Sequence, residues 1–392
     1  MKTVRCILQR GKERPVKNRH PWIFSGAIDR IDEGFEAGDL VRVLSDKDEF
    51  LGVGYLNPES QIVVRMLAFE DIVIDETFFD RKISQAIEMR KRFMPSSTNA
   101  YRLIHSEGDF LSGLTVDVYG DFLVAEFNTA GIDAWKPVIV KCLRKHFPAA
   151  SIFERSDSDL RKWEGLKRSV GVLIGSEPPE AIEIQENGLF FGVDIKGGQK
   201  TGFFLDQREN REVVRKLSAG KRVLNCFAYT GGFSVYAAKG DAKEVVSVES
   251  SESAVAMGRT NFERNQLDAE QSVWAQQDVF DYLRSTKKEF DVIILDPPAF
   301  CKSKNQIQHA ARGYKDINLQ ALRQLPKGGL LFTFSCSSYI TPDLFQKIIF
   351  GAASDAKRDV RILKKTSHAF DHPINIYHPE GEYLKGLLCE VI

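Results

Sequence analysis

The sequence lacks three features that would assign it to a class of proteins at once. No apolar run approaches the roughly 20 residues that a membrane-spanning helix needs. The first ten residues are charged and contain no apolar signal-peptide core. The six cysteines form no C-x-x-C pair, which argues against a zinc site and against a disulfide framework. These absences favour a reducing, cytoplasmic setting without a membrane anchor or a metal ion.

An excess of charge of either sign is also missing. The formal net charge is zero, which counts mildly against a nucleic-acid-binding protein. However, residues 1–20 carry seven basic side chains against one glutamate, a local net charge of +6. The basic residues are Lys2 and Arg5, followed by a candidate RNA-binding segment of Arg10, Lys12, Arg14, Lys17 and Arg19. A local basic face can bind phosphates while acidic residues elsewhere balance the total. The alternative is a solvated N-terminal arm.

Three stretches follow one another without an internal repeat. Residues 1–72 contain short apolar runs between turn residues, which is typical of a small β-barrel. The predicted strands of this stretch are residues 39–44, 50–56 and 61–67. Residues 73–180 mix predicted helices and strands, and predict an α+β domain. Its predicted helices are residues 76–94 and 135–147, and its predicted strands are residues 113–119, 122–127 and 151–154. The charged residues 155–168 fit neither pattern.

From residue 181 to residue 392 the pattern becomes that of an α/β domain. A hairpin with its turn at Asn187 and Gly188 comes first. Apolar runs then alternate with amphipathic helices, which indicates a parallel sheet covered on both faces. The predicted strands are residues 222–227, 244–249, 290–296 and 329–334. Ligands of such sheets bind at the carboxyl ends of the strands.

Successive strand ends predict an S-adenosylmethionine site. The first predicted strand is followed by the loop Ala228-Tyr-Thr-Gly-Gly-Phe233. Its two glycines do not form the dinucleotide-binding pattern G-x-G-x-x-G. A dinucleotide needs a cradle for its pyrophosphate, whereas S-adenosylmethionine has no phosphate. Glu249 can accept from the ribose hydroxyls, although alone it is equally well a surface acid, and Asp278 can accept from the adenine amine. The predicted cofactor contacts from these loops are Phe227, Ala228, Tyr229, Thr230, Gly231, Glu249, Asp278, Val279 and Asp296.

Two further loops predict the chemical site. The first loop is Asp296-Pro-Pro-Ala-Phe300. The Asp296 carboxylate can bind the amino edge of an extruded base, and the Phe300 ring can stack on its face. Cys336 follows the next predicted strand. Methylation of carbon 5 of a pyrimidine needs a nucleophile, which a thiolate adding to carbon 6 provides. Asp296 and Cys336 are therefore the candidate catalytic residues. The alternative for Cys336 is a small buried core residue, the interpretation favoured for Cys226.

The sequence resembles one family over nearly its whole length. The matching motifs are His20-Pro-Trp-Ile-Phe24, Gly202-Phe-Phe-Leu-Asp-Gln-Arg208, Tyr229-Thr-Gly-Gly-Phe-Ser234, Asp296-Pro-Pro-Ala-Phe300, Arg312-Gly-Tyr-Lys-Asp-Ile-Asn318, Phe334-Ser-Cys-Ser337 and Asp343-Leu-Phe-Gln346. They resemble the bacterial large-subunit rRNA cytosine-5 methyltransferase I family. The resemblance implies an N-terminal PUA domain, a central α+β domain and a Rossmann-like class I methyltransferase domain.

The resemblance also implies an activity. It implies methyl transfer from S-adenosylmethionine to carbon 5 of one cytidine in 23S rRNA, with Cys336 as the nucleophile. It further implies that residues 199–207 cover the cofactor, with Thr201, Phe204 and Gln207 in contact with it.

Two rival functions stay open. Asp-Pro-Pro-aromatic loops also serve methylation of a nitrogen of guanosine or adenosine in RNA, which needs no cysteine. The other rival is a non-catalytic rRNA-binding assembly factor. The sequence leaves open which nucleotide is modified, whether the RNA is naked or part of a subunit precursor, and whether the chain forms a homodimer.

Overall fold

The computed structural model describes residues 3–268 and 271–392, so that Lys2 of the basic segment lies outside the described residues. The chain forms two compact units. The first unit runs to Asn187 and includes Val193–Leu205 and Phe370–Gly381. The second unit comprises Gly188–Gly192, Asp206–Ala369 and Glu382–Ile392. The division passes through the hairpin of β12 (Ile182–Glu186) and β13 (Leu189–Val193), whose turn is at Asn187 and Gly188 as predicted.

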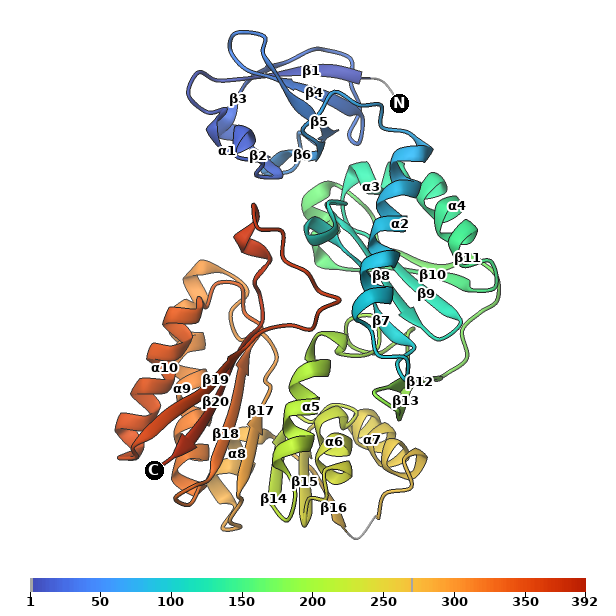
Figure 1. Ribbon diagram of the computed structural model, residues 1–392. Coiled ribbons are helices and arrows are strands. Elements are labelled where there is room, and N and C mark those ends of the chain that lie inside the picture. The colour runs from blue at the N-terminus through green and yellow to red at the C-terminus, as the bar shows by residue number, and fades with distance from the viewer. Residues whose placement is uncertain (1–2, 269–270) are drawn as a thin grey trace. The chain divides into compact units, whose positions relative to one another are not determined.

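The first unit begins with a six-stranded barrel sheet in the order β2-β6-β5-β4-β1-β3 (Figure 1). Its elements are β1 (Thr3–Leu8), α1 (Arg14–Lys17), β2 (Trp22–Phe24), η1 (Ser25–Ala27), β3 (Ile28–Ile31), β4 (Leu40–Leu44), β5 (Phe50–Leu56) and β6 (Ile62–Ala68). The three predicted strands are confirmed within one residue at each end. The prediction missed β1, β2 and β3, which are short or carry charged side chains on their exposed face, as Arg5 does in β1.

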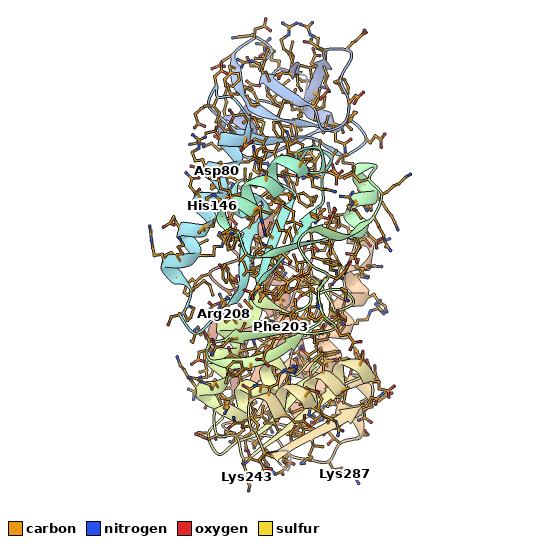
Figure 2. All side chains as sticks on the ribbon, turned by 90° about the vertical axis from the view of Figure 1, so that its right-hand side faces the viewer. Asp80, His146, Phe203, Arg208, Lys243 and Lys287 are labelled. Atoms are coloured by element: carbon orange, nitrogen blue, oxygen red, sulfur yellow. The ribbon has the colours of Figure 1, made fainter. Side chains whose placement is uncertain are left out.

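A five-stranded sheet in the order β11-β10-β9-β8-β7 follows. Its elements are α2 (Glu76–Phe93), β7 (Ala100–His105), η2 (Ser106–Asp109), β8 (Leu114–Tyr119), β9 (Phe122–Phe127), α3 (Ala130–Ala134), α4 (Lys136–His146), β10 (Ser151–Ser156), η3 (Asp159–Glu164) and β11 (Ser169–Ile174). The two predicted helices are confirmed with ends shifted by one residue. Figure 2 labels Asp80 and His146, which join α2 to α4 through a 2.8 Å contact between Oδ1 and Nε2.

Buried polar contacts join the barrel to this sheet. Arg65 Nη2 of the barrel lies 2.8 Å from a carboxylate oxygen of Glu164, and the Asn57 side chain donates to the other oxygen at 2.9 Å. Trp22 Nε1 donates to Glu107 at 2.8 Å. Glu164 belongs to the charged residues 155–168, for which the sequence predicted no structure. It is only 4% exposed, so this stretch contributes a buried carboxylate that binds the barrel.

The segment Phe370–Gly381 belongs to the first unit although it lies near the end of the chain. The Asp371 carbonyl accepts from buried Arg90 at 2.7 Å, and the Asp371 carboxylate accepts from the Arg102 amide at 2.8 Å. The ring of His378 lies 4.3 Å from that of Trp22. Arg90 also forms an ion pair with Asp109 at 2.5 Å. These contacts fix the segment against α2, β7 and the barrel.

The second unit is built on a seven-stranded sheet in the order β16-β15-β14-β17-β18-β20-β19. Its strands are β14 (Arg222–Cys226), β15 (Glu244–Glu249), β16 (Ser272–Gln276), β17 (Val292–Leu295), β18 (Leu330–Ser335), β19 (Val360–Thr366) and β20 (Lys385–Val391). The four predicted strands are confirmed. The expectation of a parallel sheet needs correction at one edge, where β20 pairs antiparallel with both β18 and β19.

Helices cover both faces of this sheet (Figure 1). They are α5 (Arg208–Leu217), α6 (Gly232–Lys239), α7 (Glu252–Arg264), α8 (Val279–Ser285), α9 (Ile307–Gln324) and α10 (Pro342–Ala356). Helices α8, α9 and α10 pack on one face, and α5, α6 and α7 on the other. Among the described residues, no helix is both long and apolar enough to span a bilayer. Because β14 to β18 run parallel, the loops after them meet at one edge of the sheet.

Candidate active site

The loop after β14 has an unusual backbone. Phe227 has a φ of 59° and Tyr229 a φ of 47°, both in the left-handed region. This conformation costs a residue with a side chain roughly 1–2 kcal/mol. The Ala228 amide donates to Val248 O at 3.0 Å, and the Tyr229 amide donates to Glu249 Oε2 at 2.9 Å, so β15 holds the loop in this conformation. Strain of this kind concentrates at functional sites.

The structure explains why glycine occupies position 231 of this loop. Its φ is 80°, and a Cβ atom at this position would lie 2.9 Å from the Trp274 ring. The missing side chain therefore faces the packing between β16 and α7, and the cofactor contact of Gly231 stays a prediction. A larger residue at Gly231 would first disturb the fold.

Polar side chains beneath the loop fix it in place. Asn225 donates to Ser234 Oγ at 2.8 Å, and Asn261 of α7 donates to Thr230 O at 2.9 Å. Thr230 Oγ1 is buried and has no hydrogen-bond partner among the described residues. A buried hydroxyl without a partner is costly unless a ligand supplies one. This atom and the Glu249 carboxylate suit the hydroxyls and the charged amino acid group of S-adenosylmethionine.

Glu249 and Asp278 both bind the backbone. Besides its bond to Tyr229, Glu249 accepts from the Ser251 amide through Oε1 at 2.9 Å. Each carboxylate oxygen accepts more than one bond, so its predicted contact to ribose is compatible with these. Asp278 Oδ1 caps α8 by accepting from the Phe280 and Asp281 amides. The adenine contact of Asp278, and of the neighbouring Val279, stays a prediction.

The segment expected to cover the cofactor is divided between the two units. In the first unit, Thr201 Oγ1 donates to Asp117 at 2.5 Å and lies 2.8 Å from the Tyr119 hydroxyl. Phe204, also in the first unit, has Lys200 Nζ 4.6 Å from its ring centre. Gln207 lies in the second unit, where its Oε1 accepts from Asn210. The cofactor contacts of Thr201, Phe204 and Gln207 stay predictions.

The two chemical loops meet at the carboxyl edge of β17 and β18. The half-exposed Cys336 lies with its Sγ 3.8 Å from the Pro297 carbonyl oxygen, directly after Asp296. The Phe300 ring lies 4.7 Å from the ring of Tyr314 and 6.3 Å from that of Phe227, so this loop also adjoins the loop after β14. The structure thus brings the two candidate catalytic residues into one region, beside the predicted cofactor loop.

Two residues that the sequence analysis did not assign hold this region together. The hydroxyls of Tyr314 and Ser337 lie 2.9 Å apart, and Ser337 Oγ accepts from the Cys301 amide at 3.2 Å. Cys301 is 2% exposed and packs in the core on the α8–α10 face, as does the fully buried Cys226. Burial raises the pKa of the Cys226 thiol. Of the three cysteines near the strand ends, only Cys336 is accessible.

Lys385 is a further residue that the sequence analysis missed. Its Nζ donates to the carbonyl oxygens of Ser337 and Tyr383, both at 2.7 Å. Burial lowers the pKa of Lys385 to about 8, and the charge of a Cys336 thiolate opposes that shift. Lys385 begins β20, and no pattern in the sequence indicates that an antiparallel strand enters the sheet at this position. The described residues include no group of three or more His, Cys, Asp or Glu side chains that could hold a metal ion.

Comparisons with known proteins agree with this fold. A family described as S-adenosylmethionine-dependent methyltransferase matches residues 163–362, and a PUA-like domain matches residues 6–69. A methyltransferase structure from Streptococcus mutans superimposes with a TM-score of 0.85 at 28% identity, covering 99% of this chain and 100% of the other. A methyltransferase complexed with SAH superimposes with a TM-score of 0.86 at 28% identity, covering 100% of both chains.

Fold and site together define an S-adenosylmethionine-dependent methyltransferase with an N-terminal PUA-like domain, and S-adenosylmethionine is its cofactor. The chain is 45% identical to the ribosomal RNA large subunit methyltransferase I of Aliivibrio fischeri strain ATCC 700601 / ES114, over 395 aligned positions that cover 100% of both proteins. It belongs to the ribosomal RNA large subunit methyltransferase I family.

The geometry of Glu249 yields a first prediction. Glu249→Ala should weaken S-adenosylmethionine binding by roughly 1.5–3 kcal/mol, because a hydrogen bond to a charged acceptor is lost and the Tyr229 backbone is released. Isothermal titration calorimetry measures the change. Glu252→Ala, an exposed acid three residues further on, is the matched control and should bind as the wild type does. Equal affinities of all three proteins, each correctly folded, would remove Glu249 from the site.

Proposed function

We propose that this chain methylates carbon 5 of a cytidine in 23S ribosomal RNA through a covalent bond between Cys336 and carbon 6 of the base. The relatives named ribosomal RNA large subunit methyltransferase I support ribosomal RNA as the substrate. The observation that carries the chemistry is the position of Cys336, an accessible thiol beside the Asp296 loop at the carboxyl edge of the sheet. Methylation of a base nitrogen would need no thiol there.

The chemistry divides between Cys336 and Asp296. The Cys336 thiolate forms a bond to carbon 6, which makes carbon 5 an electron-rich enamine carbon. S-adenosylmethionine supplies an electrophilic methyl group. Once carbon 5 carries this group, a base removes the carbon-5 proton, the electron pair re-forms the ring double bond, and the Cys336 thiolate leaves. Asp296 accepts a hydrogen bond from the exocyclic amine and orients the ring.

Lys385 acts through Cys336 and is a positioning residue. Its ammonium binds the carbonyl of Ser337, the residue next to Cys336, and so fixes the segment that carries the thiol. The positive charge of the buried Lys385, which interacts with Cys336, also favours the thiolate over the thiol. This support is present while Lys385 is protonated, below a pH of about 8, and is lost as the pH rises further.

The basic N-terminal segment supports RNA as the partner. All five predicted RNA-binding residues are exposed. Lys17 and Arg19 form ion pairs with Glu49 and Glu70, both at 2.7 Å. Three residues form no ion pair within the described part of the chain and are therefore available to phosphates: Arg10, Lys12 and Arg14.

The covalent step yields the decisive prediction. Cys336→Ala should reduce methylation by at least roughly 10³-fold, because the nucleophile is gone, while S-adenosylmethionine still binds. RNA with 5-fluorocytidine at the target should form an adduct with the wild type that survives denaturing electrophoresis, since fluorine does not leave as the proton does. The adduct should be absent from Cys336→Ala. Cys301→Ala is the matched control and should retain the adduct. A fully active Cys336→Ala variant would instead indicate methylation of a nitrogen.

The pH dependence of methylation tests the role of Lys385. In the wild type, the rate should fall as the pH rises through about 8, where Lys385 loses its charge. Lys385→Arg should keep its rate above that pH, because a guanidinium stays protonated. Lys385→Met should be slower and should need a higher pH to form the thiolate. Identical pH profiles of the three folded proteins would contradict the proposed role.

RNA binding at varied salt tests the N-terminal segment. Replacing Arg10, Lys12 and Arg14 by Gln should weaken RNA binding and flatten its salt dependence, with about 0.7–0.9 lost from the log–log slope for each phosphate contact removed. Affinity for S-adenosylmethionine should not change. A control variant replaces three other exposed lysines of the same unit by Gln: Lys91, Lys141 and Lys145. An unchanged slope in the first variant would mean that the segment is a solvated arm.

A further inference from the structure

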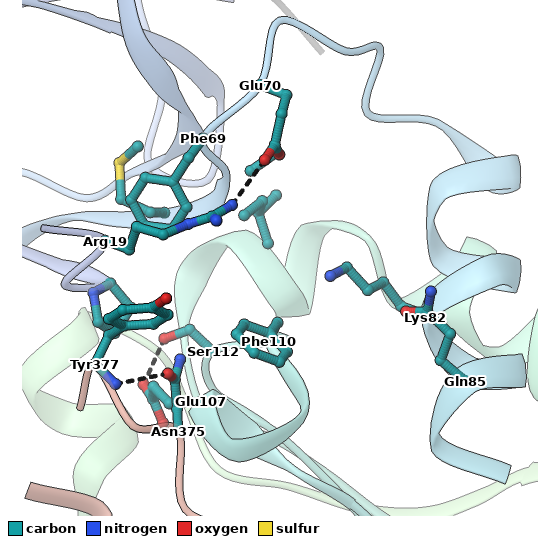
Figure 3. Close-up of a pocket in the computed structure, with 14 residues that line it drawn as sticks. Arg19, Phe69, Glu70, Lys82, Gln85, Glu107, Phe110, Ser112, Asn375 and Tyr377 are labelled. Atoms are coloured by element: carbon teal, nitrogen blue, oxygen red, sulfur yellow. Dashed lines mark hydrogen bonds and ion pairs between the residues drawn. The ribbon is translucent and has the colours of Figure 1, made fainter. Parts of the chain in front are cut away.

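A cavity of about 340 Å³ lies in the first unit (Figure 3). It is formed by the barrel, α2, the turn after η2 and the segment Phe370–Gly381. Its size falls within the roughly 300–1,000 Å³ that is usual for ligand sites. Six of its side chains carry the argument: Arg19, Phe69, Lys82, Gln85, Phe110 and Tyr377.

Aromatic rings with cations against them line the cavity. The Arg19 guanidinium carbon lies 5.4 Å from the ring centre of Phe69 and 6.0 Å from that of Tyr377. Lys82 Nζ lies 4.8 Å from the ring centre of Phe110. Phe110 is 45% exposed and Tyr377 is 42% exposed, so part of each ring is open to a ligand. Half-exposed rings beside cations are the usual platform for stacking an unpaired base.

The backbone at this cavity is strained. Phe110 has a φ of 60°, and Arg19 has a φ of 64°. Glycine or asparagine would adopt this left-handed conformation at lower cost, yet an exposed phenylalanine occupies it. The Cys336 region shows the same feature at Phe227 and Tyr229. Because nearly half of Phe110 is exposed, a ligand that uses the open part of its ring would explain why it is held there.

The available polar groups narrow the chemistry of the ligand. The carboxylate of Glu70 pairs with Arg19, and Glu107 accepts from Trp22 and from Ser112. Lys82 and the Gln85 amide have no such partner within the described part of the chain. With two cations and two carboxylates, the lining is balanced in charge and does not suit a bare anion. It suits a flat neutral ring with a polar edge, joined to one negative group.

A nucleotide has this combination. We propose that the cavity accepts the base of one unpaired RNA nucleotide, stacked on Phe110 and Tyr377, with Gln85 at the base edge and Lys82 near the adjoining phosphate. Arg19 lines the cavity and is also the last residue of the basic segment, so the RNA backbone bound by that segment continues to this site. The inference rests on the proposed function in one respect, namely that RNA is the partner of this chain. It adds a second base-binding site to that of the cysteine chemistry.

Fluorescence anisotropy with a labelled single-stranded RNA of about 12 nucleotides, and with the same strand in a duplex, tests the inference. Phe110→Gly removes the ring and keeps the left-handed backbone without strain. It should weaken binding of the single strand about 5- to 30-fold, the loss expected for one stacked base, and leave duplex binding nearly unchanged. Phe110→Tyr keeps the ring and should bind as the wild type does.

Tyr377→Ala should show the same selective loss as Phe110→Gly. Phe370→Ala is its matched control, because Phe370 is exposed on the same segment and does not line the cavity. Photocrosslinking with 4-thiouridine RNA, followed by mass spectrometry, should place crosslinks near Phe110 or Tyr377. Unchanged affinity of both cavity variants, or crosslinks only elsewhere, would overturn the inference. A thermal shift with free cytidine monophosphate, together with no thermal shift with the RNA, would also overturn the inference.

The covalent trap at Cys336 separates this inference from the proposed function. A wild-type adduct together with unchanged RNA binding by Phe110→Gly would contradict the second base site alone. A missing adduct together with selective loss of single-strand binding would contradict the cytosine-5 chemistry alone.

Discussion

The parallel pairing of β14, β15, β17 and β18 is the constraint on which the active site depends. Parallel strands in register end at one edge, so segments separated by more than 100 residues in the chain meet there. The Tyr229 amide reaches Glu249 and the Cys336 thiol reaches Pro297 only because each belongs to a neighbouring strand end. The geometry of the site therefore depends on the apolar side chains that bury these strands as well as on the polar side chains at the strand ends.

Local strain marks both regions to which we assign a ligand. Phe227 and Tyr229 adopt left-handed backbone at the cofactor loop, and Phe110 and Arg19 do so at the cavity of the first unit. In each case the surroundings fix the backbone: β15 holds the cofactor loop, and Phe110 directly follows η2, where its amide donates to Glu107 O. Strain that is maintained in this way keeps a binding surface formed before the ligand arrives.

The last part of the chain serves both units. Lys385 on β20 binds the residue next to Cys336, whereas the segment Phe370–Gly381 packs in the first unit through Asp371. An antiparallel strand can join the edge of a parallel sheet because it needs no crossover helix. For this reason the residues after α10 can contribute to two different sites. Lys385 belongs to the Cys336 region of the second unit, and Tyr377 lines the cavity of the first unit.

The sequence by itself determined the class of fold and the cofactor, and it indicated the loops of the candidate active site. Strand and helix periodicity, together with acidic residues and glycines at successive strand ends, are local signals, and they predicted β14, β15, β17, β18 and the positions of Glu249 and Cys336. Only the tertiary structure decided that Gly231 is needed for packing on Trp274 and that Lys385 lies beside the Cys336 segment. Each of these depends on a contact between residues far apart in the chain. Such contacts leave no periodic pattern in the sequence and exist only once the sheet has formed.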